Sequence, residues 1–97
     1  MQMDIPPKAL LVEAVGTFVF VCAILQFHKH EFCAFPIAAA LCGSILFAGG
    51  TSGAHLNPVV SAAMYMKNDE MKVNKMLAYW AAQTIGAAAA AKFIPTV

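Results

Sequence analysis

The clearest chemical pattern in the chain lies at residues 51–60, which read TSGAHLNPVV. Asn57 is a strong helix N-cap, because its side-chain oxygen can accept a backbone N–H from the first helical turn. Pro58 follows at the first helical position, where its missing N–H costs nothing. We therefore expect a short helix over about 58–66, which ends at the polar cluster 67–70. This helix reaches about 13 Å, roughly half of a hydrocarbon core, so its start is expected at mid-depth and facing water.

A carboxylate stands inside the first apolar run. Glu13 lies about one helical turn into that run. Charged side chains at membrane depth are costly and usually face protein or water, so Glu13 is a candidate functional residue. The alternative is a position near the interface, from which the side chain reaches the headgroups. We favour a role in which Glu13 accepts hydrogen bonds from the loop backbone at 52–55, because unpaired backbone is not tolerated at membrane depth.

The last apolar run also carries a polar residue near its middle. Gln83 lies there, with Gly86 one turn later. A lone glutamine in a membrane span commonly bonds a neighbouring helix, and the alternative is that it braces the loop before Asn57. Gly16, Gly43 and Gly86 predict close helix packing, because small residues let backbones approach in lipid.

The histidines leave two interpretations open. His55, two residues before Asn57, is either a buried, hydrogen-bonded residue or a pore-lining donor. His28 and His30 belong to the polar turn HKHE, where solvated side chains are preferred over a metal pair. No metal site is predicted.

The remaining reactive groups give no catalytic pattern. The ionisable groups expected at depth are Glu13 and His55, without a nucleophile, and the chain has no hydrolytic triad, phosphate-binding loop or zinc cluster. The three cysteines fit small buried hydrophobes better than disulfides or metal ligands. They are Cys22, Cys33 and Cys42. We expect neither an enzyme nor a cofactor.

The composition indicates an all-α transmembrane protein. Of 97 residues, 61% are hydrophobic and 11% are charged. A soluble domain this small needs more polar surface, since small domains bury a smaller fraction of their area. The net charge of +1 gives no reason to expect a nucleic-acid partner.

The apolar runs divide the chain, which we treat as one domain over residues 1–97. Three spans are expected at 9–27, 32–50 and 76–94, with the half helix at 58–66. The first run carries Glu13 and is too long for a cleavable signal peptide. Four lysines against two favour the N-terminal side as cytoplasmic, a bias small enough for insertion in both orientations.

Taken together, these residues resemble the aquaporin (major intrinsic protein) family. The resemblance covers nearly the whole chain, and its most specific part is the loop SGAHLNP at 52–58. The other matching residues are Glu13, Thr17 and Phe20 in the first span and Gln83 and Gly86 in the last. Family members consist of two such repeats in tandem, and this chain resembles the first repeat alone.

The resemblance implies a pore made from two inverted repeats, whose half helices meet at the bilayer midplane. A single repeat would expose its re-entrant loop to lipid, which backbone hydrogen bonding forbids. We therefore expect an antiparallel homodimer in which each chain supplies half of a pore. By analogy with family tetramers, four pores would use eight chains.

The resemblance also implies passive conduction of water or a small neutral solute such as glycerol. Carbonyl groups would line the path at Gly53, Ala54, His55 and Leu56. The central motif would be Asn57, Pro58 and Val59, in which Asn57 orients the solute. The positive ends of the half helices would oppose protons and cations, while Glu13 and Gln83 support the loop.

Two residues depart from the family pattern. Val59 stands where the family usually has alanine, and Val60 stands where the second repeat has the arginine of the selectivity filter. The filter positions implied by the resemblance are Ile37, Ile45, Ala54 and Val60. This apolar lining either admits glycerol-sized solutes or dewets and conducts poorly. A non-conducting membrane scaffold or adhesion protein is therefore the second hypothesis, and a regulatory fragment that pairs with a full-length family member is the third.

Overall fold

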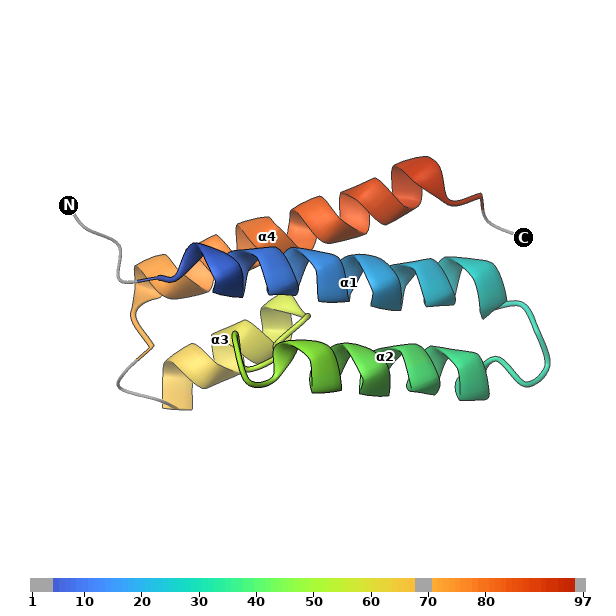
Figure 1. Cartoon of the computed structure of the whole chain (residues 1–97), viewed down its shortest axis with the longest axis horizontal. Helices are drawn as coiled ribbons and strands as arrows, with labels where there is room; N and C mark the ends of the chain where they lie inside the picture. Colours follow the sequence, from blue (N-terminus) through green and yellow to red (C-terminus); the bar gives the residue numbers. More distant parts are fainter. Residues whose placement is uncertain (1–4, 68–70, 96–97) are drawn as a thin grey trace.

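The computed structural model describes residues 5–67 and 71–95, and this part of the chain forms four helices without a strand. The helices are α1 (Pro7–Phe27), α2 (Ala34–Ala48), α3 (Pro58–Lys67) and α4 (Val73–Phe93) (Figure 1). Since α1 and α4 have 21 residues each, they reach about 31 Å, whereas α3 with 10 residues reaches only about 15 Å. The chain thus has two long helices and one of half their length.

The helix bounds differ from the expected ones at several ends. The second helix covers Ala34–Ala48 rather than 32–50, the last begins at Val73 rather than 76, and the short one ends at Lys67 rather than 66. The second helix stops early because the N–H groups of Thr51 and Ser52 both bond the carbonyl of Ala48 and close a turn. Of the polar cluster at 67–70, residues 68–70 lie outside the described part of the chain.

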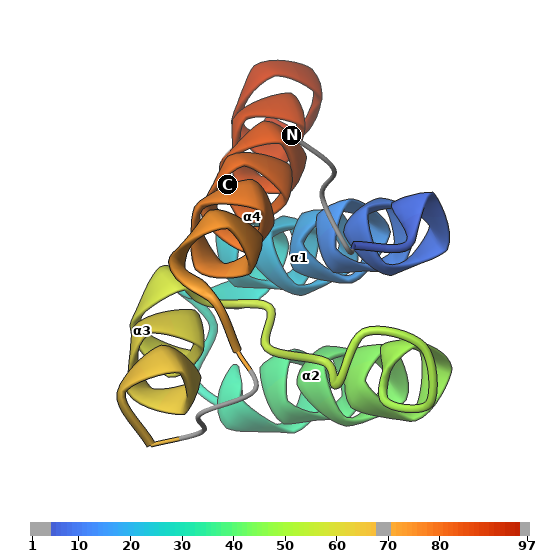
Figure 2. The same ribbon diagram turned by 90° about the vertical axis from the view of Figure 1, so that its left-hand side faces the viewer.

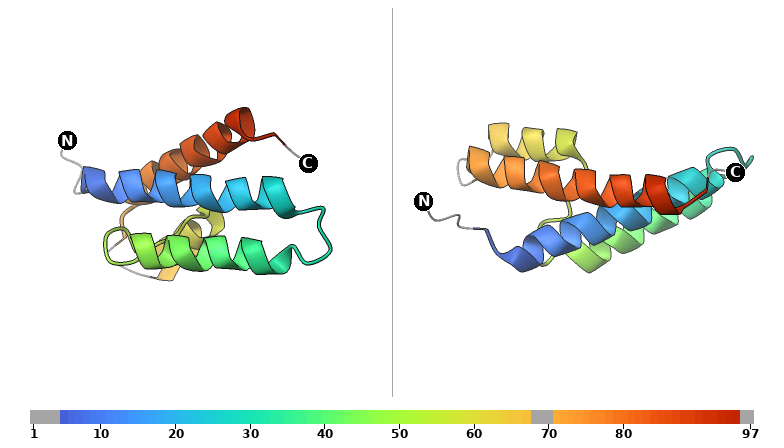
Figure 3. Two further views of the ribbon diagram at one scale, coloured as in Figure 1. Left: turned by 45° about the vertical axis from the view of Figure 1, so that its right-hand side comes forward. Right: turned by 90° about the horizontal axis from the view of Figure 1, so that it is seen from above.

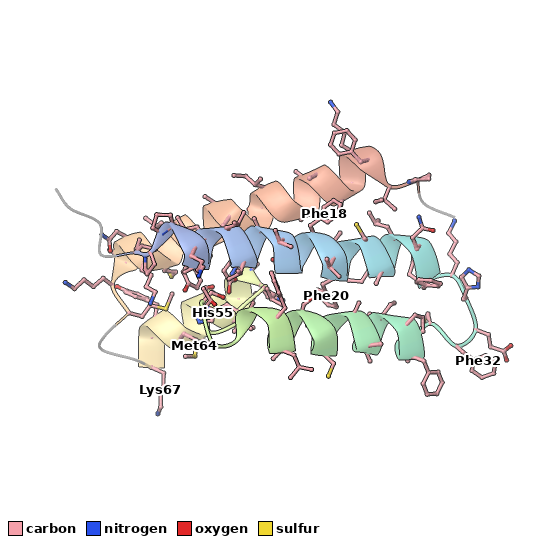
Figure 4. All side chains as sticks on the ribbon, in the orientation of Figure 1. Phe18, Phe20, Phe32, His55, Met64 and Lys67 are labelled. Atoms are coloured by element: carbon pink, nitrogen blue, oxygen red, sulfur yellow. The ribbon has the colours of Figure 1, made fainter. Side chains whose placement is uncertain are left out.

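The helices α1 and α4 run side by side in the same direction, and α2 returns along the other side of α1 (Figures 1 and 3). Seen end-on, α1 and α2 form one pair while α3 packs against α4 (Figure 2). The molecule measures 46 × 24 × 20 Å. Lys67 at the end of α3 and Phe32 in the turn between α1 and α2 lie at opposite ends of the long axis (Figure 4).

Two glycines allow this close packing. A Cβ atom on Gly86 would overlap the backbone carbonyl of Ala14, so α1 and α4 approach through bare backbone. A Cβ on Gly16 would lie 2.6 Å from Cδ2 of Leu56, which fixes the loop before α3 against α1. The third glycine in the predicted packing set, Gly43, has no neighbour within 4 Å of its Cβ position, so that part of the prediction is wrong.

A small apolar core, centred on Ala9, Met76 and Tyr79, is accompanied by buried polar and exposed apolar side chains. Several polar side chains are buried: Glu13, Thr17, Ser44, Ser52, Ser61 and Gln83. Large apolar side chains are exposed along every helix, among them Leu11, Leu46, Met66 and Ile85. This distribution suits a hydrocarbon surround, in which polar groups must find partners inside the protein.

Among the described helices, α1 is the one that is both long and apolar enough to cross a membrane, and α2 is apolar but shorter. The helix α4 equals α1 in length but includes Lys75 and Gln83, which lower its hydropathy. Three full spans were expected, and among the described helices α1 alone has the length and composition of a membrane span.

Candidate pore site

The site is organised around the buried carboxylate of Glu13. Its Oε2 accepts hydrogen bonds from the Ser52 hydroxyl at 2.6 Å and the His55 N–H at 2.9 Å. Its Oε1 accepts hydrogen bonds from the Leu56 N–H at 2.8 Å and from Nε2 of Gln83 at 3.0 Å. The contact expected between Glu13 and the loop backbone is present. One side chain on α1 thus joins the loop before α3 to the middle of α4.

The loop before α3 has an unusual backbone. Gly53, Ala54 and Leu56 have positive φ values of 89°, 53° and 56°. Left-handed conformations are uncommon for residues with a side chain and persist where the surroundings enforce them. The Ala54 N–H also bonds the Ser52 hydroxyl at 3.1 Å, so three consecutive N–H groups are held on the side of Glu13.

The carbonyl groups of this loop differ from its N–H groups, because they lack hydrogen-bond partners among the described residues. Within the described part of the chain, no hydrogen bond engages the oxygens of residues 53–56. A row of free acceptors at the tip of a helix can hydrogen-bond a passing polar molecule. The N–H groups of the loop are therefore hydrogen-bonded within the protein, whereas its carbonyl oxygens are available to a ligand.

The start of α3 agrees with the capping pattern. Oδ1 of Asn57 accepts the Val59 N–H at 2.8 Å, and α3 begins at Pro58. This bond uses the amide oxygen and leaves the Asn57 NH₂ group, which is exposed, as a donor. The indole N–H of Trp80 donates to the Pro58 carbonyl at 2.9 Å and ties the first turn of α3 to α4.

His55, labelled in Figure 4, belongs to a polar cluster that is connected to Glu13 through Gln83. Its Nδ1 pairs with the Ser61 hydroxyl at 2.9 Å, and its ring packs on Tyr79 with centroids 4.8 Å apart. Nε2 of Gln83 also donates to the Ser61 hydroxyl at 2.9 Å, and the Tyr79 hydroxyl donates to the Ser52 carbonyl at 2.7 Å. These contacts favour a hydrogen-bonded structural histidine over a pore-lining donor.

Comparison with known proteins identifies this combination of elements. The sequence profile of the major intrinsic protein family matches residues 5–97. The chain belongs to this family. As a major intrinsic protein it is an integral membrane protein of a channel-forming family, not of an enzyme family.

Among curated relatives, Aquaporin-11 of the horse is 34% identical over 88 residues, covering 88% of this chain and 32% of the relative. Aquaporin-11 of human is 33% identical and that of mouse 30% identical, each over 82 residues, or 81% of this chain and 30% of the relative. This major intrinsic protein chain thus spans about a third of the length of the curated relatives it matches. No solved structure gives a significant match.

The four residues predicted to form the filter of this major intrinsic protein lie on three elements. Ile37 and Ile45 lie two turns apart on α2, Ala54 lies in the loop, and Val60 lies in the first turn of α3. Ile45 is 44% exposed and Val60 41% exposed. A constriction built from these side chains stays a prediction.

Sequence reasoning did not single out Ser52, Ser61, Tyr79 or Trp80, although all four hold the loop or α3 in place. For Tyr79 a signal existed, since it lies four residues before Gln83 and therefore on the same face of α4. The three cysteines have free thiols, but none is buried in this chain, since Cys22 and Cys33 are half-buried and Cys42 is exposed, so the prediction of buried thiols is wrong. No group of three or more metal-binding side chains occurs among the described residues. The turn histidines His28 and His30 are both exposed.

Proposed function

We propose that this chain supplies one half of a membrane pore that conducts water and small neutral solutes such as glycerol. The observation that carries the proposal is the loop at 53–56: the N–H groups of residues 54–56 are held by Ser52 and Glu13, while the carbonyl oxygens of residues 53–56 have no partner among the described residues. A row of free acceptors replaces the hydrogen bonds that a solute loses when it leaves water. Asn57 follows this row with an exposed donor, so a solute meets acceptors and then a donor.

A second, inverted repeat completes the pore in this proposal. The loop and the tip of α3 lie partway along a structure whose long helices span about 31 Å, so a lone copy exposes free carbonyls at membrane depth. Val59 is 73% exposed at that tip and needs an apolar partner. We propose that a second copy of this chain, inserted antiparallel, covers the free carbonyl groups and packs against Val59. We further propose that eight chains build four pores.

The two half helices also account for selection against charge in this proposal. Each α3 directs its positive N-terminal end at the centre, which disfavours cations and protons there. Residues 51–60 contain neither arginine nor lysine, so no side-chain cation of this segment adds to the barrier. The mouths lined by Ile37, Ile45 and Val60 are apolar, which favours solutes that carry carbon as well as hydroxyl groups.

The decisive experiment is stopped-flow shrinkage of proteoliposomes containing the purified chain, first with sucrose and then with glycerol as the osmolyte. We expect water flux well above that of empty liposomes. Asn57→Asp places a negative charge at the pore centre and is expected to abolish this flux, whereas Asn74→Asp adds the same charge at the start of α4 and is expected to preserve it. Equal flux in protein-containing and empty liposomes, with folded protein, contradicts the proposal.

The antiparallel arrangement has its own test. A single cysteine introduced by Lys29→Cys, with the three native cysteines replaced by alanine, lies in the exposed turn between α1 and α2. If both orientations are present, a membrane-impermeant thiol reagent labels half of the protein in sealed vesicles and all of it after lysis. Complete labelling or complete protection in sealed vesicles rules out the antiparallel homodimer.

A non-conducting scaffold is the second candidate function. The exposed valine at Val59 and the apolar filter positions favour it, because extra methyl groups at the centre and a dry mouth both oppose conduction. Flux separates this candidate from the channel. The mass of the detergent-solubilised complex separates both from a fragment that pairs with a full-length relative.

A further inference from the structure

The connection between α1 and α2 lies at one end of the molecule, and we call residues 27–35 the 27–35 turn (Figure 1). It includes the sequence HKHE at 28–31, and all four of these side chains are exposed. Backbone hydrogen bonds shape the turn, since the His30 N–H donates to the Phe27 carbonyl at 2.9 Å and the Cys33 N–H donates to the His30 carbonyl at 3.2 Å. Because α1 reaches about 31 Å, the turn is expected at the level of the lipid headgroups.

Exposed aromatic rings flank these polar side chains. Phe32 is 67% exposed and Phe35 73% exposed, and their ring centroids lie 6.4 Å apart. Phe93, near the end of α4, is 69% exposed, and this end of α4 lies at the same end of the molecule as the turn (Figure 1). Aromatic rings beside cations are typical of segments that enter the boundary between headgroups and acyl chains.

His28 is placed to carry a positive charge. Its Nδ1 lies 2.8 Å from the Ile24 carbonyl oxygen. A carbonyl oxygen only accepts, so Nδ1 carries a hydrogen and Nε2 is the acceptor of the neutral ring. A second proton therefore adds at Nε2 and leaves this hydrogen bond intact. His28 also caps the C-terminal end of α1, where the helix dipole favours a cation.

His30 can carry a positive charge in the same turn. Its ring packs on the ring of Phe27, with centroids 5.8 Å apart and planes at 54°. An imidazolium keeps such a contact, because an aromatic face attracts a cation. Both histidines can thus take up a proton without losing the contact that holds them. Imidazole side chains do so in the range between about pH 5 and about pH 8.

The other charges at this end of the molecule are few. The described part of the chain holds two carboxylates, Glu13, which is buried beside the loop before α3, and Glu31 in the turn. The described cations at this end are Lys29 and Lys92, and the remaining titratable group of the turn is the half-buried thiol of Cys33. Two lysines against one carboxylate give a net charge of +1, and two protonated histidines raise it to +3.

We propose that the 27–35 turn binds the phosphate groups of anionic phospholipids, and that it does so when His28 and His30 are protonated. The imidazolium N–H groups and the Lys29 ammonium supply charge-assisted donors to a phosphate oxygen. The rings of Phe32 and Phe35 enter the acyl boundary beside it, which favours a lipid over a soluble anion. This inference goes beyond the proposed pore and does not depend on it.

The test uses the whole chain, labelled with ¹⁵N in histidine, in vesicles of phosphatidylglycerol mixed with phosphatidylcholine or of phosphatidylcholine alone. Solid-state NMR measures the dipolar contact between each imidazole nitrogen and lipid ³¹P at about pH 5 and about pH 8. We expect contacts at His28 and His30 in the phosphatidylglycerol vesicles at the lower pH, and a fall of about fivefold at the higher pH, as for one positive charge removed from an anionic surface. His55 is the internal control, because its ring is bonded to Ser61 within the protein and is expected to contact no phosphorus.

Matched variants separate charge from shape, with the preference for spin-labelled phosphatidylglycerol over phosphatidylcholine measured by electron paramagnetic resonance. His28→Asn combined with His30→Asn removes both titrating groups, so this preference is expected to be the same at both pH values. His28→Lys combined with His30→Lys keeps the charge, so the preference is expected to stay high at about pH 8. Lys67→Asn removes a cation at the opposite end of the molecule (Figure 4) and is expected to leave the pH dependence unchanged. If the paired variants do not reconstitute, the NMR contacts of the natural chain decide by themselves.

Each other outcome overturns the inference. It fails if His28 and His30 contact no phosphorus in phosphatidylglycerol vesicles at the lower pH, or if the contacts are equal in both kinds of vesicle or at both pH values. A contact that appears when inorganic phosphate is added to phosphatidylcholine vesicles assigns the turn to a soluble anion and also overturns it. Water flux through the same vesicles is measured in parallel and decides the pore proposal separately.

Discussion

The indole N–H of Trp80 donates a 2.9 Å hydrogen bond to the carbonyl oxygen of Pro58. This bond joins the middle of a long helix to the first residue of a short one. The bond holds Pro58, the first residue of α3 after the irregular loop. The position of the neighbouring Asn57 therefore depends on this bond. A half helix of 10 residues is too short to be stable by itself, and contacts of this kind hold it.

Trp80→Phe is therefore expected to loosen α3 while it keeps an aromatic ring on α4. The loss of one hydrogen bond predicts destabilisation by about 1 kcal/mol, measured by thermal unfolding in detergent with circular dichroism. Tyr65→Phe is the control, because Tyr65 lies on α3 and its hydroxyl has no hydrogen bond within the described residues. Equal stability of the Trp80 variant and the natural chain would show that the bond contributes nothing.

Glu13 gives the strongest expected effect. Glu13→Gln replaces one acceptor oxygen by an NH₂ group, which faces donors at Ser52 and His55 or at Leu56 and Gln83. At least one buried backbone N–H loses its acceptor, so we predict destabilisation by about 1–3 kcal/mol.

The consequence for function follows from the same geometry. A loop without its acceptor loses the conformation that frees the carbonyl groups, so flux of the Glu13→Gln protein in proteoliposomes is expected to approach that of empty liposomes. Glu31→Gln makes the same chemical change in the exposed turn and is the control. Normal flux in the Glu13 variant would mean that another contact holds the loop.

Part of this site was predictable from sequence. Asn57 and Pro58 have local roles, a cap and a first helical residue, so their types alone predict them. The contact between Glu13 and the loop was predictable because a buried carboxylate requires hydrogen-bond donors and the N–H groups of a buried loop require acceptors.

Other parts were not predictable, because they depend on how helices align in space. The bonds from Tyr79 to Ser52 and from Trp80 to Pro58 require a particular register of α4 against the loop and α3, which tertiary packing decides. The positive φ values at Ala54 and Leu56 carry no signal either, since neither residue is glycine. The exposure of Gly43 was not predicted for a related reason. A small residue permits close approach of two helices but does not determine whether a helix packs there.

Two glycines make a matched pair for testing the helix contact. Gly86→Ala places a methyl group against the Ala14 carbonyl, which cannot move without displacing α1, so we expect destabilisation by about 1–3 kcal/mol. Gly43→Ala places the same group in open space and is expected to stabilise α2 by up to about 1 kcal/mol through helix propensity. Thermal unfolding of both variants in detergent checks the signs, and equal shifts would contradict the packing shown here.

The last prediction concerns Val60, which is 41% exposed in the first turn of α3. Val60→Arg adds a cation and five hydrogen-bond donors at a position that we propose to line the mouth of the pore. A longer side chain narrows the mouth, so glycerol flux is expected to fall more than water flux, and the ratio of the two is the measured quantity. Val73→Arg makes the same substitution at the exposed start of α4, away from the proposed mouth, and is expected to leave the ratio unchanged. If the Val60 variant alters neither flux, this residue does not line the path, and the filter assigned to Ile37, Ile45, Ala54 and Val60 must be abandoned.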